Sequence, residues 1–294
     1  FRLSGKAYHD EIYRLNDSTP YMFAEINEHR NRFEIRDFYV EQEFDNGVYV
    51  KAGHQILAWG MSEFLRVTDL INVENQYQLG QQDLEDLRLQ VPAVLASAAA
   101  GGWNWDAVVT YHAGRDDIAP RRDEFDLFAP LYEAGGTISI RRPERDYEFF
   151  LRASMQYDSG DIQIIAGDFN DNALALERVS AVDGQPVAEL FQNRMRALGI
   201  AANHVTGSWL VFGELGWHAN RVARPTERSV AFSADGWVKK DQLLGVLGIE
   251  YSGFRDLLLT AELDGQRIRD NAPFGYGDGT LVSLGLRARW TGLN

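Results

Sequence analysis

The sequence predicts an all-β fold: a transmembrane antiparallel up-and-down β-barrel of about 12–16 strands. Three observations lead to this fold class. No apolar run is long enough for a membrane-spanning helix, several segments alternate apolar and polar residues, and short and long connections alternate along the chain. Together they favour strands over helices, and a membrane over water as the surroundings of the sheet.

Hydropathy excludes a helical membrane protein. The longest uncharged stretch covers residues 89–105 and is interrupted by Pro92, Gly101 and Asn104, whereas a spanning helix needs about 20 mostly apolar residues. The first residues, Phe1-Arg2-Leu3-Ser4-Gly5, lack the basic start and apolar core of a signal peptide. This beginning is expected of a processed, mature chain and equally of a cytosolic one.

Composition narrows the possible chemistry. The 294 residues include no cysteine and carry a formal net charge of −14. Disulfides, thiolate metal sites and a cysteine nucleophile are therefore excluded. The acidic balance argues against a nucleic-acid partner, because phosphate binding needs a basic face.

Alternation of apolar and polar residues is clearest in three segments, at residues 103–112, 147–158 and 282–290. A period of two indicates strands with one apolar and one polar face. Each segment is about 10 residues long, the length that a tilted strand needs to cross a bilayer. We expect outward, lipid-facing side chains at Trp103, Trp105, Tyr147, Leu151, Leu284 and Leu286.

The connections carry independent information. Asp45-Asn46-Gly47 is a strong hairpin signal. We expect four further short turns and five long polar connections, in strict alternation, as in a barrel with short periplasmic turns and long extracellular loops. The short turns are expected near Gly101-Gly102, Pro143-Glu144, His204-Val205-Thr206 and Gly253-Phe254, and the long connections at 60–90, 113–134, 159–194, 220–240 and 266–279.

These patterns predict one domain over residues 1–294, with residues 60–90 as a long loop that forms an inward constriction or plug. We expect the barrel to be incomplete at the C-terminus, because the chain ends Thr291-Gly292-Leu293-Asn294 rather than on an aromatic residue that closes a strand. A secreted or periplasmic β-sandwich or solenoid is the alternative fold.

The window from Phe38 to Pro92 resembles a Gram-negative outer-membrane family catalogued as domain of unknown function 1302. The resemblance implies a porin-like barrel in the bacterial outer membrane. It also implies traffic in lipids or other hydrophobic molecules, with periplasmic or outer-membrane transport components as partners. It rests on Phe38-Tyr39-Val40-Glu41, Lys51-Ala52-Gly53-His54-Gln55-Ile56-Leu57-Ala58-Trp59-Gly60, Arg66-Val67-Thr68-Asp69, Ile71-Asn72 and Asp83-Leu84-Glu85-Asp86-Leu87-Arg88.

Ionisable side chains on the polar strand faces are the candidate pore-lining residues. In a barrel they face the lumen and set its selectivity. They form either a substrate path, in which a basic strip faces a carboxylate ladder, or a salt-bridged wall that only stabilises the barrel. The candidates are Glu148, Arg152, Glu214, Glu250, Glu262, Arg287 and Arg289.

The loop at 60–88 is the candidate constriction. Loops of this length are uncommon unless they are functional or disordered. Folded inward, its charges need partners, because an unpaired charge is costly away from water; a solvated surface loop is the alternative. The constriction residues are Glu63, Arg66, Asp69, Asp83, Glu85, Asp86 and Arg88.

Enzyme, metal and cofactor signatures are absent from the sequence. The six histidines have no ligand spacing, and there is no Gly-x-Ser-x-Gly or His-Glu-x-x-His motif. A hydrolase would need a serine or carboxylate close to His112 or His218. The acidic cluster at 116–126 is expected to be a solvated face, or else a divalent-bridged contact with lipopolysaccharide. We therefore predict a channel or a transport component among outer-membrane lipids, with a non-transporting scaffold barrel as the alternative.

Overall fold

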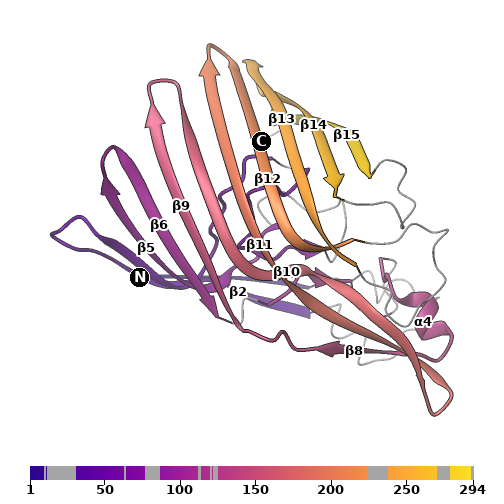
Figure 1. Ribbon diagram of the computed structural model, residues 1–294. Coiled ribbons are helices and arrows are strands. Elements are labelled where there is room, and N and C mark those ends of the chain that lie inside the picture. The colour runs from indigo at the N-terminus through magenta and orange to yellow at the C-terminus, as the bar shows by residue number, and fades with distance from the viewer. Residues whose placement is uncertain are drawn as a thin grey trace.

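One large antiparallel sheet organises the chain (Figure 1). The computed structural model describes residues 1–9, 11, 31–62, 64–76, 87–111, 114–119, 121, 125–223, 238–269 and 279–292. The sheet strands within these ranges are β1 (Arg2–His9), β2 (Asn31–Glu43), β3 (Tyr49–Gln55), β5 (Val91–Ala100), β6 (Trp103–Tyr111), β8 (Thr137–Arg141), β9 (Tyr147–Tyr157), β10 (Gly160–Val182), β11 (Gln185–Thr206), β12 (Trp209–Ala223), β13 (Val238–Phe254), β14 (Leu257–Ile268) and β15 (Thr280–Trp290).

The strand order is that of a meander. Each strand pairs with the next in the order β1-β2-β3-β5-β6-β9-β10-β11-β12-β13-β14-β15, and β8 lies off this path in parallel with β11. The sheet curls strongly but is not closed, because β1 and β15 are its two ends (Figure 1). The predicted all-β antiparallel fold is confirmed, and its 13 described strands lie within the predicted number.

Two of the predicted connections are wrong. Residues 159–194, predicted as a long loop, form most of β10 and β11, which a two-residue turn at Asp183-Gly184 joins. Their polar residues suggested a loop, but they pair within the hairpin: Asp168 contacts Arg194 and Arg196 at 2.5 and 3.3 Å. The predicted turn at Pro143-Glu144 lies instead between β8 and β9, and Asp158-Ser159 makes the short turn.

With these corrections the two kinds of connection lie at opposite ends of the sheet. Short turns join β2 to β3, β5 to β6, β9 to β10, β11 to β12 and β13 to β14 at one end. The other end holds the long excursions and the outer half of the β10–β11 hairpin, beside which lie β8 and the short helix α4 (Ala129–Glu133) (Figure 1). None of the described helices is long and apolar enough to cross a membrane.

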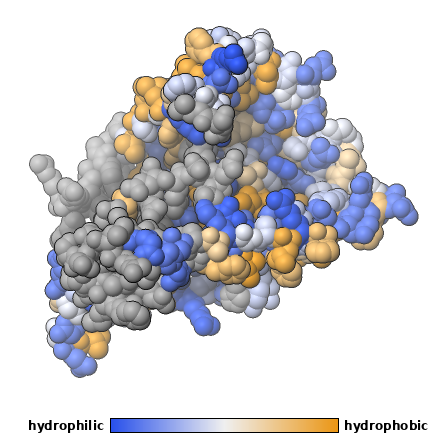
Figure 2. Space-filling view, turned by 180° about the vertical axis from the view of Figure 1, so that it is seen from behind, coloured by the Kyte–Doolittle hydropathy of each residue, from blue (hydrophilic) through white to orange (hydrophobic). Residues whose placement is uncertain are grey.

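The outer face of the sheet is apolar and exposed. Trp105, Tyr147, Leu151, Leu284 and Leu286 are 53–71% exposed, and many alternating neighbours resemble them. Figure 2 shows hydrophobic residues gathered in patches on the surface seen from behind. Soluble monomers rarely expose so much contiguous apolar surface, which lipid would cover. Trp103, also predicted to face outward, is half-buried.

Candidate functional site

A segment between β3 and β5 crosses the inner face of the sheet. We call residues 56–62 and 64–76 the strap; it includes the short strand β4 (Asn75–Gln76). In Figure 1 the strap runs as a purple coil within the curve of the sheet. Ile71, Thr68 and Asn72 are each 0% exposed, so the strap is packed against the sheet rather than solvated.

Glycines on the inner face form the seat of the strap. A Cβ atom at Gly199 of β11 would lie 2.7 Å from Thr68, and one at Gly216 of β12 would lie 2.8 Å from Val67. A Cβ atom at Gly285 of β15 would lie 2.5 Å from the ring of Phe64. Glycine in a strand commonly marks the close approach of another part of the chain. The strap therefore reaches from β3 across to the far edge of the sheet.

Glu214 on β12 is the main polar anchor of the strap. Its Oε1 accepts hydrogen bonds from the backbone N–H groups of Met61 and Ser62 at 2.5 and 2.7 Å. Its Oε2 accepts from the backbone N–H and the hydroxyl of Thr68 at 3.0 and 2.6 Å. Four donors thus satisfy one carboxylate that is only 4% exposed, as a buried charge requires.

Glu262 on β14 provides a second anchor. The Ser62 hydroxyl donates to its Oε2 at 2.5 Å, and the same hydroxyl oxygen accepts the backbone N–H of Leu65 at 3.0 Å. On β12, His218 meets the carbonyl oxygen of Val67 through Nε2 at 2.9 Å. These contacts hold the middle of the strap against β12 and β14.

The charged side chains of the strap pair with one another and with Arg88, which follows the strap. Arg88 donates to the carboxylate of Asp69 at 2.6 Å, and Asp69 is 2% exposed. Arg66 donates to the carbonyl oxygens of Asp69 and Asn72 at 2.7 and 2.5 Å, and lies 3.5 Å from Glu74. Both arginines therefore have acidic or carbonyl partners within the strap.

Asn72 forms hydrogen bonds both with the beginning of the strap and with the chain that follows it. Its side-chain oxygen accepts the backbone N–H of Leu57 at 2.7 Å, and its amide donates to the carbonyl of Leu89 at 2.7 Å. Its own carbonyl accepts from Asn172 of β10 at 3.0 Å. The entry and exit of the strap are thus tied through one buried side chain.

Apolar packing holds the remainder of the strap. Leu57, Trp59, Leu70, Ile71 and Val73 join a cluster with side chains of β5, β6, β9, β10 and β11. Full burial of an aliphatic side chain such as Ile71 contributes about 1.5–3 kcal/mol. Several such side chains make spontaneous withdrawal of the whole strap unfavourable.

The predicted pore-lining residues all lie on strands whose inner face the strap crosses, but they differ in burial and in their hydrogen-bond and ion-pair partners. Glu148, Glu214 and Glu262 are buried and hydrogen-bonded; Thr110 donates to Glu148 at 2.6 Å. Arg152 pairs with Asp106 at 2.6 Å and stacks over Trp59. Arg287, Arg289 and Glu250 are more exposed toward the rim. Of the predicted constriction residues, Glu63, Asp83, Glu85 and Asp86 lie outside the described residues.

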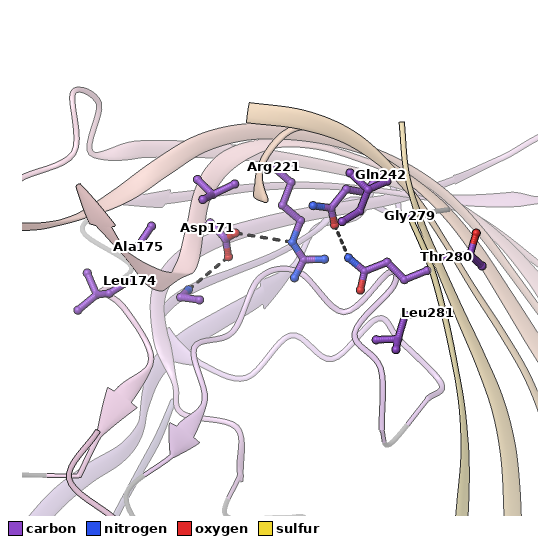
Figure 3. Close-up of a pocket in the computed structure, with 12 residues that line it drawn as sticks. Asp171, Leu174, Ala175, Arg221, Gln242, Gly279, Thr280 and Leu281 are labelled. Atoms are coloured by element: carbon purple, nitrogen blue, oxygen red, sulfur yellow. Dashed lines mark hydrogen bonds and ion pairs between the residues drawn. The ribbon is translucent and has the colours of Figure 1, made fainter. Parts of the chain in front are cut away.

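Space remains on both sides of the strap. Toward the short turns, a cavity of about 620 Å³ is lined by strap residues 58–61 together with Asp106, Arg152, Asp161 and Asn203. Toward the long loops, a cavity of about 310 Å³ lies among β10 and β12–β15 (Figure 3). We call the first the inner cavity and the second the outer cavity; strap residues line only the inner one.

A second loop clips the end of the strap. Asp116 accepts the backbone N–H of Glu74 at 2.8 Å, and β7 (Asp117–Ile118) pairs with β4 in parallel. Burial raises the pKa of the Asp116 carboxyl to about 6, although the Glu74 N–H and Arg66 oppose the shift. The part of the acidic cluster that holds Asp116 is therefore buried rather than solvated, which corrects the expectation for this residue.

Sequence reasoning missed several parts of this site. Ser62, Thr68 and Asn72 are neutral residues inside a predicted loop, and the glycines of β11, β12 and β15 read as ordinary strand residues. The available signals were the repeated glycine on the polar faces of strands and the place of Thr68 and Asn72 in the motifs of the family resemblance. Within the described ranges, no group of three or more His, Asp or Glu side chains is arranged to hold a metal ion.

Comparison with known proteins adds a family match. Solved structures similar to this chain include the anion-selective porin from Comamonas acidovorans, with 10% identity, a TM-score of 0.47 and 89% of this chain covered. This chain spans 65% of the length of that porin. A loop-deletion variant of OmpT, an outer membrane protein of Vibrio cholerae, has 12% identity and a TM-score of 0.45, over 87% of this chain and 69% of its own.

A further porin structure has 14% identity and a TM-score of 0.43, over 100% of this chain and 90% of its own. No curated protein sequence matches the chain significantly. Residues 1–121 match the model of the family described as "Protein of unknown function (DUF1302)". They contain the whole strap, including Gly60 packed on Asp69, Asn72 and the Arg88–Asp69 pair. The resemblance to the DUF1302 family predicted from the sequence is therefore confirmed over residues 1–121.

Proposed function

We propose that the chain is a porin-like channel of the bacterial outer membrane, and that the strap restricts its passage. The observation that carries the proposal is the anchoring of a buried strap across a polar inner face, while the opposite face of the same sheet is apolar and exposed. Lipid suits the outer face, and water or a polar solute suits the inner one.

The path of permeation runs beside the strap rather than through it. Residues 67–73 are too well packed to leave space, whereas the inner cavity is bordered by Asn104, Gln156, Ser154 and Asn203. Together with the charged Asp106, Arg152 and Asp161, these neutral polar side chains replace part of a solute's hydration. Passage of small polar solutes past residues 58–61 of the strap follows from this arrangement.

Planar-bilayer conductance of the purified protein tests the proposal. The wild-type protein should open discrete channels, and the double variant Arg66→Ala/Arg88→Ala should change their size, because Asp69 then lacks its cationic partners. The double variant Arg178→Ala/Arg141→Ala is the matched control, since it removes the same charge from the exposed ion pairs of the outer hairpin and β8. Heat-modifiable migration of each variant checks folding. Absence of conductance from the folded wild-type protein would refute the channel.

A scaffold barrel without transport is the second candidate. The apolar cluster that packs the strap onto β9–β11 favours it, because it fills part of the interior. Under this alternative the lipid bilayer stays impermeable in the presence of the folded protein, and removal of the strap anchors alters only stability.

We do not propose an enzyme. His218 meets the carbonyl of Val67 through Nε2, rather than a serine or carboxylate that it could activate. His112 lies outside the described residues. For partners, we propose outer-membrane lipid and lipopolysaccharide on the apolar face, together with periplasmic or outer-membrane transport components. Co-purification of the protein with outer-membrane rather than inner-membrane fractions tests the location.

A further inference from the structure

The outer cavity lies where two strands depart from regular pairing. Its volume of about 310 Å³ is at the lower end of the range for small-molecule sites. Its charged lining residues are Asp171 of β10 and Arg221 of β12, with apolar walls that include Leu174, Ile268 and Leu281 (Figure 3).

A bulge in β12 turns Arg221 inward. Simple alternation from Glu214 and His218 would place Arg221 on the outer, lipid-facing side of the strand. The register instead shifts between His218 and Arg221, and Asn220 adopts a positive φ of 59°. Positive φ is uncommon outside glycine, although asparagine tolerates it best. Bulges of this kind re-aim side chains and are frequent next to functional sites.

A second irregularity presents Asp171. The register of β10 against β11 shifts between Asn170 and Leu174, so that three residues of β10 face Asn193 alone. Asn193 is 1% exposed, and its side-chain amide donates to the carbonyl of Asn220 at 2.5 Å. One buried side chain thus ties the two irregularities together and fixes the position of Asp171 relative to Arg221.

The two charges form a long ion pair rather than a hydrogen-bonded one. Arg221 Nε is 3.8 Å from Asp171 Oδ2, longer than a hydrogen bond. Figure 3 shows the rest of the guanidinium extending into the cavity, away from Asp171. Nearby, the Gln266 amide donates to the Gln242 side-chain oxygen at 2.6 Å. The cavity therefore offers one cation, one adjacent anion and an apolar wall.

We propose that this cavity binds a small zwitterion of the α-amino-acid type with an apolar side chain. Its carboxylate would bind the fork of Arg221, and its ammonium group would bind Asp171. An α-amino acid carries both charges on one carbon, which matches the short separation of the two protein charges. The apolar side chain would rest against Leu174, Ile268 and Leu281. The inference concerns binding alone and holds whether or not the protein conducts.

Equilibrium dialysis of the folded protein in a neutral detergent tests this, with radiolabelled leucine as the probe. Two competitors each lack one charge: 4-methylpentanoate has no ammonium group, and isoamylamine has no carboxylate. We expect saturable leucine binding, and competition by either analogue that is about tenfold weaker than by leucine itself, because each forfeits a charge-assisted contact.

Variants locate the site. Arg221→Gln and Asp171→Asn should each weaken leucine binding about tenfold or more, and Arg178→Gln on the outer hairpin should leave it unchanged. Leu281→Trp fills the cavity without changing either charged residue and should also abolish binding. This variant keeps the proposal testable if Arg221→Gln does not fold. Saturable leucine binding that survives Leu281→Trp in a folded protein would overturn the proposal, as would no binding to the wild type or equal competition by all three compounds.

Discussion

Two parts of the strap, which we call the root and the tip, are held by different kinds of interaction. The root, residues 57–59 and 70–73, contributes five buried apolar side chains to a cluster with β5, β6 and β9–β11. The tip, residues 61–62 and 64–68, has one fully buried apolar side chain, Val67, and depends on Glu214, Glu262 and the glycine seat. The packing of the root does not depend on charge and is weakened when a side chain is shortened and a cavity forms. The tip, in contrast, is held by individual hydrogen bonds. The root thus depends on apolar packing, and the tip on individual polar contacts.

The largest expected effect is at the root. Ile71→Ala removes a side chain that is 0% exposed and should lower the free energy of unfolding by about 2–5 kcal/mol, through lost burial and a residual cavity. Urea unfolding in lipid vesicles measures it. Ile35→Ala, on an exposed outer position of β2, is the control for loss of the same side chain. A loss at Ile71 no greater than at Ile35 would contradict the packed root.

The second largest loss of stability is expected when the charge that anchors the tip is removed. Glu214→Gln keeps one acceptor oxygen but turns an N–H donor toward Thr68, and should cost about 3 kcal/mol, because hydrogen bonds to a charged group are lost. For each kcal/mol of stability lost, the conductance of Glu214→Gln should fluctuate more than the conductance of Ile71→Ala. The reason is that Glu214→Gln frees the tip while the root stays packed. If the two variants show equal conductance fluctuation for each kcal/mol of stability lost, the distinction between root and tip is wrong.

The clip at Asp116 should make the end of the strap sensitive to pH. Its folded pKa of about 6 lies above the ordinary value of 3.8, so the folded state binds the proton more tightly. Stability from this group is fully present below about pH 4 and is lost as pH rises through 6, by about 3 kcal/mol. Unfolding midpoints at pH 4, 5, 6 and 7.5 should show this slope in the wild type, and a smaller slope in Asp116→Asn. An identical slope in both proteins would assign the pH dependence to another group.

The smallest effect is expected at the glycine seat. A methyl group at Gly216 would lie 2.8 Å from Val67, so the tip must shift slightly, at a cost of about 1 kcal/mol. Gly216→Ala should therefore alter conductance with little loss of stability. Gly265→Ala on β14, where nothing lies within 4 Å, serves as the comparison. A larger stability loss at Gly265 than at Gly216 would be inconsistent with a seat.

Strands were predictable where one face meets lipid and the other meets polar groups. The segments at 147–158 and 282–290 became β9 and β15 because alternation is a local property. The whole of β10 and the first half of β11 escaped prediction, because residues 159–194 were predicted as a loop. There the polar residues pair across the hairpin, as Arg178 does with Glu189 at 2.9 Å, and local polarity alone does not distinguish a paired strand from a loop.

The sequence by itself determined the class of sheet, its apolar face, the hairpin turn at Asn46-Gly47 and the presence of an unusual charged segment at 60–88, since periodicity, turn chemistry and composition act over a few residues. Only the tertiary structure decided what that segment does. The donors of Met61, Ser62 and Thr68 meet Glu214 about 150 residues away, and Asn193 ties the bulge of β10 to that of β12. The partner of a buried polar group is chosen by the folded geometry of the sheet, and no local pattern in the chain specifies it.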